Sequence, residues 1–318
     1  MSAPPPVTPD ERASSALRTH QHLRLSLVLL IAVLLLAVAI QTVVVSWQPL
    51  RLGWNLLPSI SHYFYTPARW VFISVLVGAA LALLALSGRR GPTVALDIAA
   101  IFAPVIAVVP PGVLPGTDGG SDGITCVRDD CIPTEVLADV RASVATYGVA
   151  VILVVVVMGR VRRRQTVRAT RGHLIVSAVA VASGLALALL AFAPGASRGF
   201  PFNIWPIPSV HFAAVLLFFA AFTAVPLFYG WRPAEPDETP PTPWQAGVYR
   251  LVTWLMAVDV LFLAVALLAL EHGWTDFAGA PVVLIGEALA LILFAWFWWE
   301  QTLQRWNDEE TPFLIPPA

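Results

Sequence analysis

The sequence predicts an all-α integral membrane protein, a bundle of about eight transmembrane helices with the N-terminus and the C-terminus in the cytoplasm. Composition is the first observation: 58% of the residues are hydrophobic and 12% are charged, whereas charged residues make up roughly a quarter of a soluble domain. The other two observations are a series of long apolar runs and an uneven distribution of arginine. The net charge of −1 gives no basic surface for a nucleic-acid partner.

Eight apolar runs recur along the chain, each close to the ~17 to 25 residues that cross a bilayer core as a helix. They are Leu25–Trp47, Trp70–Leu86, Thr93–Val113, Ala142–Met158, Leu174–Ala193, Ser209–Phe228, Leu251–Leu270 and Pro281–Trp299. The first run continues past the small residues at 37–39, so we interpret it as an uncleaved span and not as a signal peptide.

The remaining segments divide the chain around these spans. Residues 1–21 are rich in Pro, Ser and Thr and predict a disordered cytoplasmic tail. Residues 22–301 form the eight-helix transmembrane domain, and residues 302–318 form a second cytoplasmic tail. Within the domain we expect an outer loop at 115–140 and a Pro-rich cytoplasmic loop at 231–249.

Arginine fixes the predicted orientation, because short cytoplasmic loops carry an excess of positive charge. All 19 basic residues are arginine. With the N-terminus inside, fourteen lie on the cytoplasmic side, six of them between Arg160 and Arg171. This run either contacts anionic lipid headgroups or only sets the topology. Tryptophans near the predicted helix ends, Trp298 among them, agree with the boundaries because indole rings favour the membrane interface.

Three acidic residues fall inside predicted spans, where an ionised side chain is costly. Asp97 lies about one turn from the cytoplasmic side, roughly 6 Å deep, and can reach water. Asp259 lies near the middle of its span, about 13 Å deep, so it has to be protonated, paired or facing a water-filled cavity. Glu287 lies about two turns below the outer face. For Asp259 and Glu287, a structural hydrogen bond and a functional role both remain open.

Polar residues gather near the predicted outer face and form the candidate ligand site. Ser209 is a plausible N-cap, which places His211 in the first turn of the sixth span. We expect Arg69, His211 and Glu287 to converge, with Arg69 pairing with the Glu287 carboxylate. The candidate ligand-binding residues are Ser61, His62, Tyr65, Arg69, His211, Asp259 and Glu287.

Metal binding has little support, because zinc requires three or four ligands and no second histidine lies one turn from His211. No cofactor is predicted, and no catalytic residue or metal ligand is assigned. Cys126 and Cys131 are the only cysteines, lie close together and fall on the predicted oxidising side, so we expect a local disulfide.

The stretch Ser59–Arg69, Ser-Ile-Ser-His-Tyr-Phe-Tyr-Thr-Pro-Ala-Arg, is followed by a span that contains Phe72. It resembles the opening signature of an uncharacterised bacterial multi-pass membrane protein family, a domain of unknown function, loosely similar to Frag1/DRAM/Sfk1-like membrane proteins. The resemblance implies a multi-pass protein of the bacterial cell (inner) membrane and no established reaction.

Ser74, Asp97 and His211 also resemble, more distantly, the residues of intramembrane metal-dependent lipid hydrolases such as alkaline ceramidases and progestin/adiponectin-type receptors. The preferred hypothesis is therefore a membrane protein that binds a lipid or small molecule in an outward-facing polar cavity. The alternatives are an intramembrane metal-dependent lipid hydrolase and a proton-coupled transporter that uses Asp259 and Glu287. Membrane lipids are the predicted partners, and the oligomeric state stays open.

Overall fold

The computed structural model describes residues 9–46, 56–87, 92–112, 124–127, 130–164, 170–195, 199–204, 207–232, 239–271, 273–275, 277 and 280–306. Within these residues the chain forms eight long helices, one short 3-10 helix and two small β-hairpins. The predicted helical bundle is thereby confirmed. The elements are α1 (Pro9–Ser46), η1 (Ile60–Tyr65), α2 (Arg69–Leu86), α3 (Thr93–Val108), β1 (Ile124–Val127), β2 (Asp130–Pro133), α4 (Thr134–Arg164), α5 (Arg171–Phe192), β3 (Phe202–Ile204), β4 (Ile207–Ser209), α6 (Val210–Trp231), α7 (Pro243–Glu271) and α8 (Val282–Gln304).

Seven of the described helices are long and apolar enough to cross a membrane, and α3 is a shorter apolar helix. Large apolar side chains point outward around the bundle: Leu81 is 64% exposed, Ile152 61% and Leu261 64%. A soluble protein rarely exposes so much contiguous apolar surface. Lipid surrounds such side chains at no cost, so the chain is a multi-pass membrane protein.

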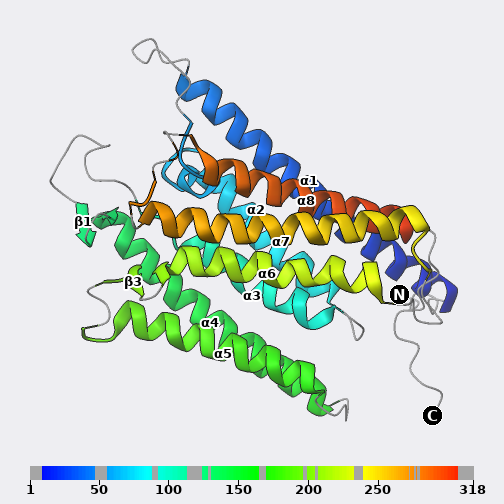
Figure 1. The fold of residues 1–318 in the computed structure, drawn as a ribbon. Helices are drawn as coiled ribbons and strands as arrows, with labels where there is room; N and C mark the ends of the chain where they lie inside the picture. The colour runs from blue at the N-terminus through cyan, green and yellow to red at the C-terminus, as the bar shows by residue number, and fades with distance from the viewer. Residues whose placement is uncertain are drawn as a thin grey trace, which may run out of the picture.

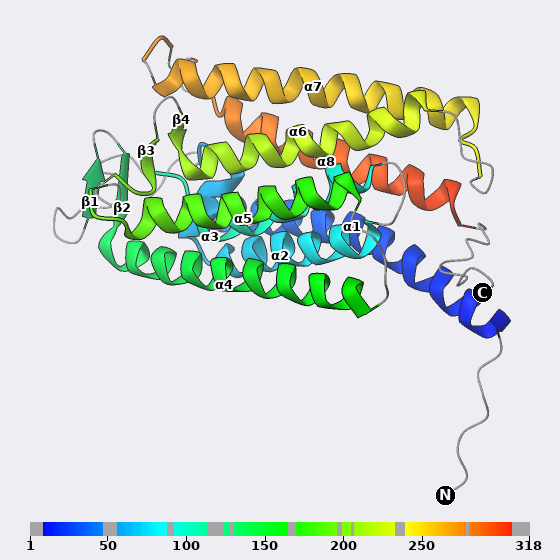
Figure 2. The ribbon, with the colours of Figure 1, turned by 90° about the horizontal axis from the view of Figure 1, so that it is seen from below.

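The helices alternate in direction, so α1 begins and α8 ends at one end of the bundle, which we call the terminal end (Figure 1). The opposite end carries η1 and is called the η1 end. Six helices contact one another in a closed ring, in the order α1, α2, α3, α6, α7 and α8. The α4–α5 hairpin lies outside this ring against α3, on one side of the molecule (Figures 1 and 2).

Small and aromatic residues fill the ring. Ala99, Ala103 and Ala107 of α3 have no exposed surface, as expected for a small-residue stripe that allows close helix approach. Between α6 and α8, the rings of Phe222 and Phe294 lie 4.3 Å apart. Trp298 packs beside them and is 3% exposed. Its ring therefore faces the inside of the bundle, and its depth at the membrane interface stays a prediction.

Several boundaries differ from the sequence-based expectation. Helix α1 begins at Pro9, so residues 9–21, predicted to be disordered, are helical. Good helix formers in this segment extend the apolar span, because propagation from an existing helix needs no new nucleus. At α7, the helix begins at Pro243 and takes up the last part of the predicted Pro-rich loop.

Two short antiparallel hairpins, β1–β2 and β3–β4, were not predicted. The β1–β2 register places Cys126 opposite Cys131 on the backbone. The cysteine side chains lie outside what the structure describes, which gives no support to a disulfide. That bond stays a prediction.

Candidate functional site

The 3-10 helix η1 closes the ring of helices at the η1 end. Ser59 caps its N-terminus by accepting the His62 backbone N–H at 3.3 Å. Ile60, Ser61, Tyr63 and Phe64 are buried. Although η1 falls between two spans, it is packed inside the bundle, so its backbone N–H groups need partners within the protein.

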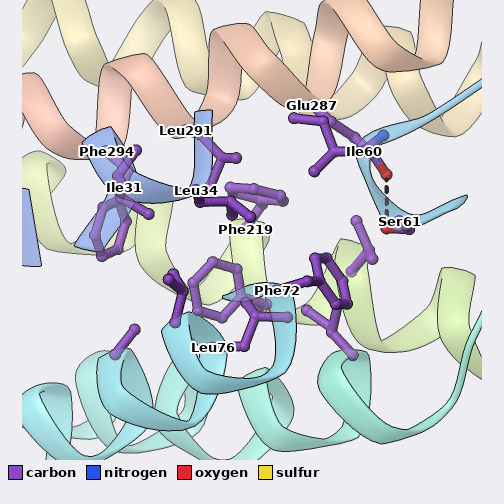
Figure 3. A pocket seen from close by; sticks show the side chains of 15 residues that line it. Ile31, Leu34, Ile60, Ser61, Phe72, Leu76, Phe219, Glu287, Leu291 and Phe294 are labelled. Carbon is purple, nitrogen blue, oxygen red and sulfur yellow. Dashed lines mark hydrogen bonds between the residues drawn. The ribbon is translucent and has the colours of Figure 1, made fainter. Parts of the chain in front are cut away.

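Glu287 of α8 accepts hydrogen bonds from η1 through both of its carboxylate oxygens. Its Oε2 accepts the Ile60 backbone N–H at 2.6 Å, and its Oε1 accepts the Ser61 hydroxyl at 3.2 Å. The Ser61 backbone N–H also bonds to this carboxyl group. In return, the Pro58 carbonyl oxygen accepts the Leu284 N–H at the start of α8 at 3.0 Å. Glu287 therefore joins α8 to η1, as Figure 3 shows from inside the bundle.

Below Ser61 and Glu287 lies an interior cavity that is otherwise lined by apolar side chains, including Phe72, Phe219 and Leu291 (Figure 3). Its volume is about 40 Å³. Pockets for small organic ligands usually measure ~300–1,000 Å³. This cavity is too small for a lipid or a drug-sized molecule.

Three side chains converge on the segment after α3, where Pro110 and Pro111 stop the helix and leave its last carbonyl groups without helical partners. The His211 Nδ1 bonds to the Val109 oxygen at 2.5 Å, and the Tyr65 hydroxyl donates to the Pro111 oxygen at 2.7 Å. The His62 Nε2 bonds to the Gly112 oxygen at 3.0 Å. The predicted cluster of Tyr65, His62 and His211 thus forms, and it holds α3 against η1 and α6.

A carbonyl oxygen only accepts, so these contacts fix the histidine tautomers. His62 donates from Nε2, and its Nδ1 accepts the Ser59 hydroxyl at 2.6 Å. Burial lowers the pKa of His62 to about 4, so its imidazole is neutral at neutral pH. His211, placed in the first turn of α6 by the predicted N-cap Ser209, donates from Nδ1. Its buried Nε2 has no partner among the described residues.

Arg69 does not pair with Glu287, which corrects the predicted ion pair. Its guanidinium group lies 4.2 Å from the ring centroid of Phe64 and 3.9 Å from the carboxylate of Asp139. Asp139 is on α4, so Arg69 connects the start of α2 to the hairpin outside the ring. Glu287 needs no cation because η1 donors already surround its carboxyl group.

Asp259 lies on the buried face of α7 and is 5% exposed. Its Oδ2 has no hydrogen-bond partner among the described residues. Gly286 of α8 leaves room for it, since a Cβ atom there would lie 3.3 Å from the Asp259 Oδ1. Asp259 and Glu287 are close enough to repel each other when both are ionised. Asp259 and Glu287, two of the three acidic residues found inside predicted spans, are therefore neighbours.

A larger groove, which the sequence analysis missed, lies between α2–α3 and the α4–α5 hairpin. Its volume is about 850 Å³ and its lining is mostly apolar, with Ala100, Val151 and Ala180 among the lining residues. Asp97 and His173 line its terminal end, and Asp97 accepts the Ser87 hydroxyl at 2.5 Å. At mid-height the Tyr147 hydroxyl donates to the Ile101 oxygen at 2.9 Å. No local sequence motif predicts this groove, because it forms only between segments that are far apart in the sequence.

Polar groups also link helices at the terminal end, another feature that the sequence analysis did not identify. The Tyr249 hydroxyl donates to the Gln304 Oε1 at 2.6 Å, and the Gln304 Nε2 donates to the Thr239 oxygen at 2.8 Å. Arg305 is 5% exposed and lies over the Tyr229 ring. These contacts fasten α6, α7 and α8 together.

Ser74, Asp97 and His211 do not assemble into a hydrolase-like site. Ser74 is exposed on α2. Asp97 is twelve residues before Val109, which contacts His211, so the two side chains are about 18 Å apart along α3. Among the described residues there is no group of three or more His, Cys, Asp or Glu side chains that could hold a metal ion. No protein-family model, curated protein or solved structure matches the chain.

Proposed function

We propose that this membrane protein binds a membrane lipid in the groove between α2–α3 and α4–α5. The observation that carries the proposal is the groove itself, with its volume of about 850 Å³ and its mostly apolar lining. This volume lies in the range of ligand pockets, ~300–1,000 Å³. The 40 Å³ cavity beside Glu287 does not reach that range.

The position of the groove favours a lipid over a water-soluble ligand. It is walled by helices whose outer faces are apolar, such as Val149 of α4, 67% exposed, and Ile175 of α5, 52% exposed. An acyl chain can enter from the bilayer sideways between such helices, whereas a polar solute would first have to leave water. This places the lipid outside the six-helix ring and not in the outward-facing polar cavity expected from sequence.

A pair of neighbouring small residues on α5 tests the proposal. Ser177 lines the groove, whereas Ala178 is exposed and lies outside the lining. The wild-type protein, purified in mild detergent, should retain about one phospholipid per chain in native mass spectrometry. Ser177→Phe should lose that lipid because the ring fills the groove, and Ala178→Phe should keep it. A lipid-free wild-type protein, or equal retention by both variants, would contradict the proposal.

Proton coupling is a second candidate function, favoured by one specific observation. The buried Asp259 carboxyl group has an oxygen without a partner among the described residues and lies beside Gly286, next to Glu287. An unpartnered carboxyl group in the membrane is a natural proton carrier, because its neutral form is far less costly there. Proton uptake by liposomes that contain the protein, abolished by Asp259→Asn, would support this function.

A further inference from the structure

The charges along α4 are unequal at its two ends. Near the η1 end the described residues of α4 include Glu135, Asp139 and Arg141, and Asp139 pairs with Arg69 of α2. At the terminal end the sequence of α4 reads Gly-Arg-Val-Arg-Arg-Arg, residues 159–164, and α5 begins at Arg171. A molecule lying along the groove therefore has acidic and basic residues in equal number near one end and a strongly basic neighbourhood at the other.

The helical register connects these arginines to the groove. Met158 and Gly159 of α4 line its terminal end. Positions 162 and 163 follow them by four residues, so the α4 backbone carries these two positions on the same face, one turn further out. On α5, Arg171 precedes the lining residue Leu174 by three residues and is exposed. The apolar groove thus opens directly toward arginine positions of both helices.

Asp97 is the acidic residue that lines the same end, and its charge opposes that of the arginines. It is 8% exposed and accepts the Ser87 hydroxyl, so its carboxyl group bonds to the residue that follows α2. The four arginines at the terminal end of α4 and Arg171 outnumber it. The net charge around the mouth of the groove is positive.

We infer that the lipid in the groove is an anionic phospholipid whose acyl chains lie between α2–α3 and α4–α5 and whose phosphate headgroup meets the arginines at the end of α4 and the start of α5. This inference rests on the proposed function and adds the class and direction of the lipid. A zwitterionic lipid would fill the same apolar groove but would gain less from the arginines.

Competition between two lipids with identical chains tests the inference. The full-length protein is equilibrated in detergent with equal amounts of palmitoyl-oleoyl phosphatidylglycerol and palmitoyl-oleoyl phosphatidylcholine, and the retained lipid is identified by native mass spectrometry. Each arginine near an anionic headgroup changes affinity about fivefold. The wild-type protein should therefore retain phosphatidylglycerol in at least about fivefold excess.

The variant Arg162→Gln/Arg163→Gln/Arg164→Gln should retain the same total amount of lipid but with a preference for phosphatidylglycerol at least about fivefold lower than that of the wild type, the remainder coming from Arg160 and Arg171. A matched control, Arg12→Gln/Arg18→Gln, removes positive charge from α1, which does not line the groove, and should keep the preference. Wild-type protein in about 1 M salt, where the Debye length is about 3 Å, tests the same charge contact without substitution and should also lose the preference.

Equal retention of the two lipids by the wild-type protein would overturn the inference while leaving the proposed function intact. A preference that is undiminished in the triple variant and in high salt, or that falls equally in the α1 control, would overturn it as well. A wild-type protein that retains neither lipid would instead remove the proposed function on which the inference rests.

Discussion

Single residues inside this bundle form polar contacts that stabilise the fold, because the membrane interior has no water to replace a lost hydrogen bond. Glu287 is the clearest example, because an η1 hydroxyl and backbone N–H groups bond to its carboxyl group. Replacement by glutamine keeps the shape but places an amide NH₂ group against a backbone donor. Loss of one charge-assisted hydrogen bond costs about 1.5–3 kcal/mol.

Glu287→Gln should therefore unfold at a lower temperature than the wild-type protein in the same detergent, as measured by intrinsic tryptophan fluorescence. Glu135→Gln, at an exposed position in the first turn of α4, is the control and should change little. Equal midpoints for Glu287→Gln and wild type would show that the contact with η1 adds nothing to stability.

Asp259 differs from Glu287 because its Oδ2 has no described partner. We expect its carboxyl group to be protonated in the membrane, where an unpaired charge is costly. Dicyclohexylcarbodiimide, an apolar reagent, reacts with protonated carboxyl groups. Peptide mass spectrometry should find the adduct on Asp259 and not on Glu287, whose oxygens are occupied by η1. An unmodified Asp259 would argue for an ionised or inaccessible group.

His62 gives η1 a dependence on pH. Burial lowers its pKa to about 4, from an unfolded value of about 6.5. Between these values the unfolded chain binds a proton that the folded chain does not, so stability falls as the pH falls from about 6.5 to about 4. His62→Gln should lose less stability over this interval than wild type, measured by thermal unfolding at several pH values. His22→Gln, at an exposed position of α1, should behave as wild type.

At the scale of elements, the contact between α7 and α8 depends on Gly286. A Cβ atom there would lie 2.6 Å from the Leu263 Cδ2 and 3.0 Å from its Cγ. Gly286→Ala should therefore force the two helices apart and destabilise the protein by about 1–3 kcal/mol, the usual range for overpacking.

Gly148→Ala on α4 is the matched control, since nothing lies within 4 Å of the added atom. That change should be neutral or stabilising by up to about 1 kcal/mol, because alanine favours a helix more than glycine does. Urea or thermal unfolding in detergent compares the two variants. Similar effects of both substitutions would mean that the α7–α8 contact is looser than the structure shows.

The elements also show where local sequence rules were sufficient. The cap at Ser209 and the position of His211 in the first turn of α6 were predicted from neighbouring residues and are confirmed. The start of α1 was not, because composition alone does not reveal that an apolar span propagates its helix back to Pro9. The hairpins β1–β2 and β3–β4 were missed because strands of three or four residues leave almost no periodic signal.

For the whole molecule, the arginine distribution predicts that the terminal end faces the cytoplasm. Single cysteines at positions 2 and 166, in a chain with Cys126→Ser and Cys131→Ser, should react with an impermeant maleimide only after the cells are permeabilised. Thr275→Cys, exposed at the η1 end, should react in intact cells. Labelling in the opposite pattern would invert the predicted topology.

The sequence by itself determined that the chain is an apolar helical bundle and which residues are costly inside a membrane. Hydropathy over about 20 residues is a local property, and an acidic residue inside such a run is visible without knowledge of its neighbours. Glu287 was identified in this way, and Ser61, His62, Tyr65 and His211 were identified as polar residues near the predicted outer face. The structure brings each of them into the contacts around η1.

Only the tertiary structure decided which helices are neighbours. Hydrophobicity does not choose partners in a bilayer, since lipid is as apolar as leucine, so helix contacts depend on shape and on scattered polar groups. For this reason the sequence predicted an ion pair between Arg69 and Glu287. In the fold, Arg69 instead contacts Phe64 and Asp139, and Glu287 accepts hydrogen bonds from η1. The groove has the same origin: it exists because α4 and α5 pack on α3 outside the ring, which no stretch of sequence records.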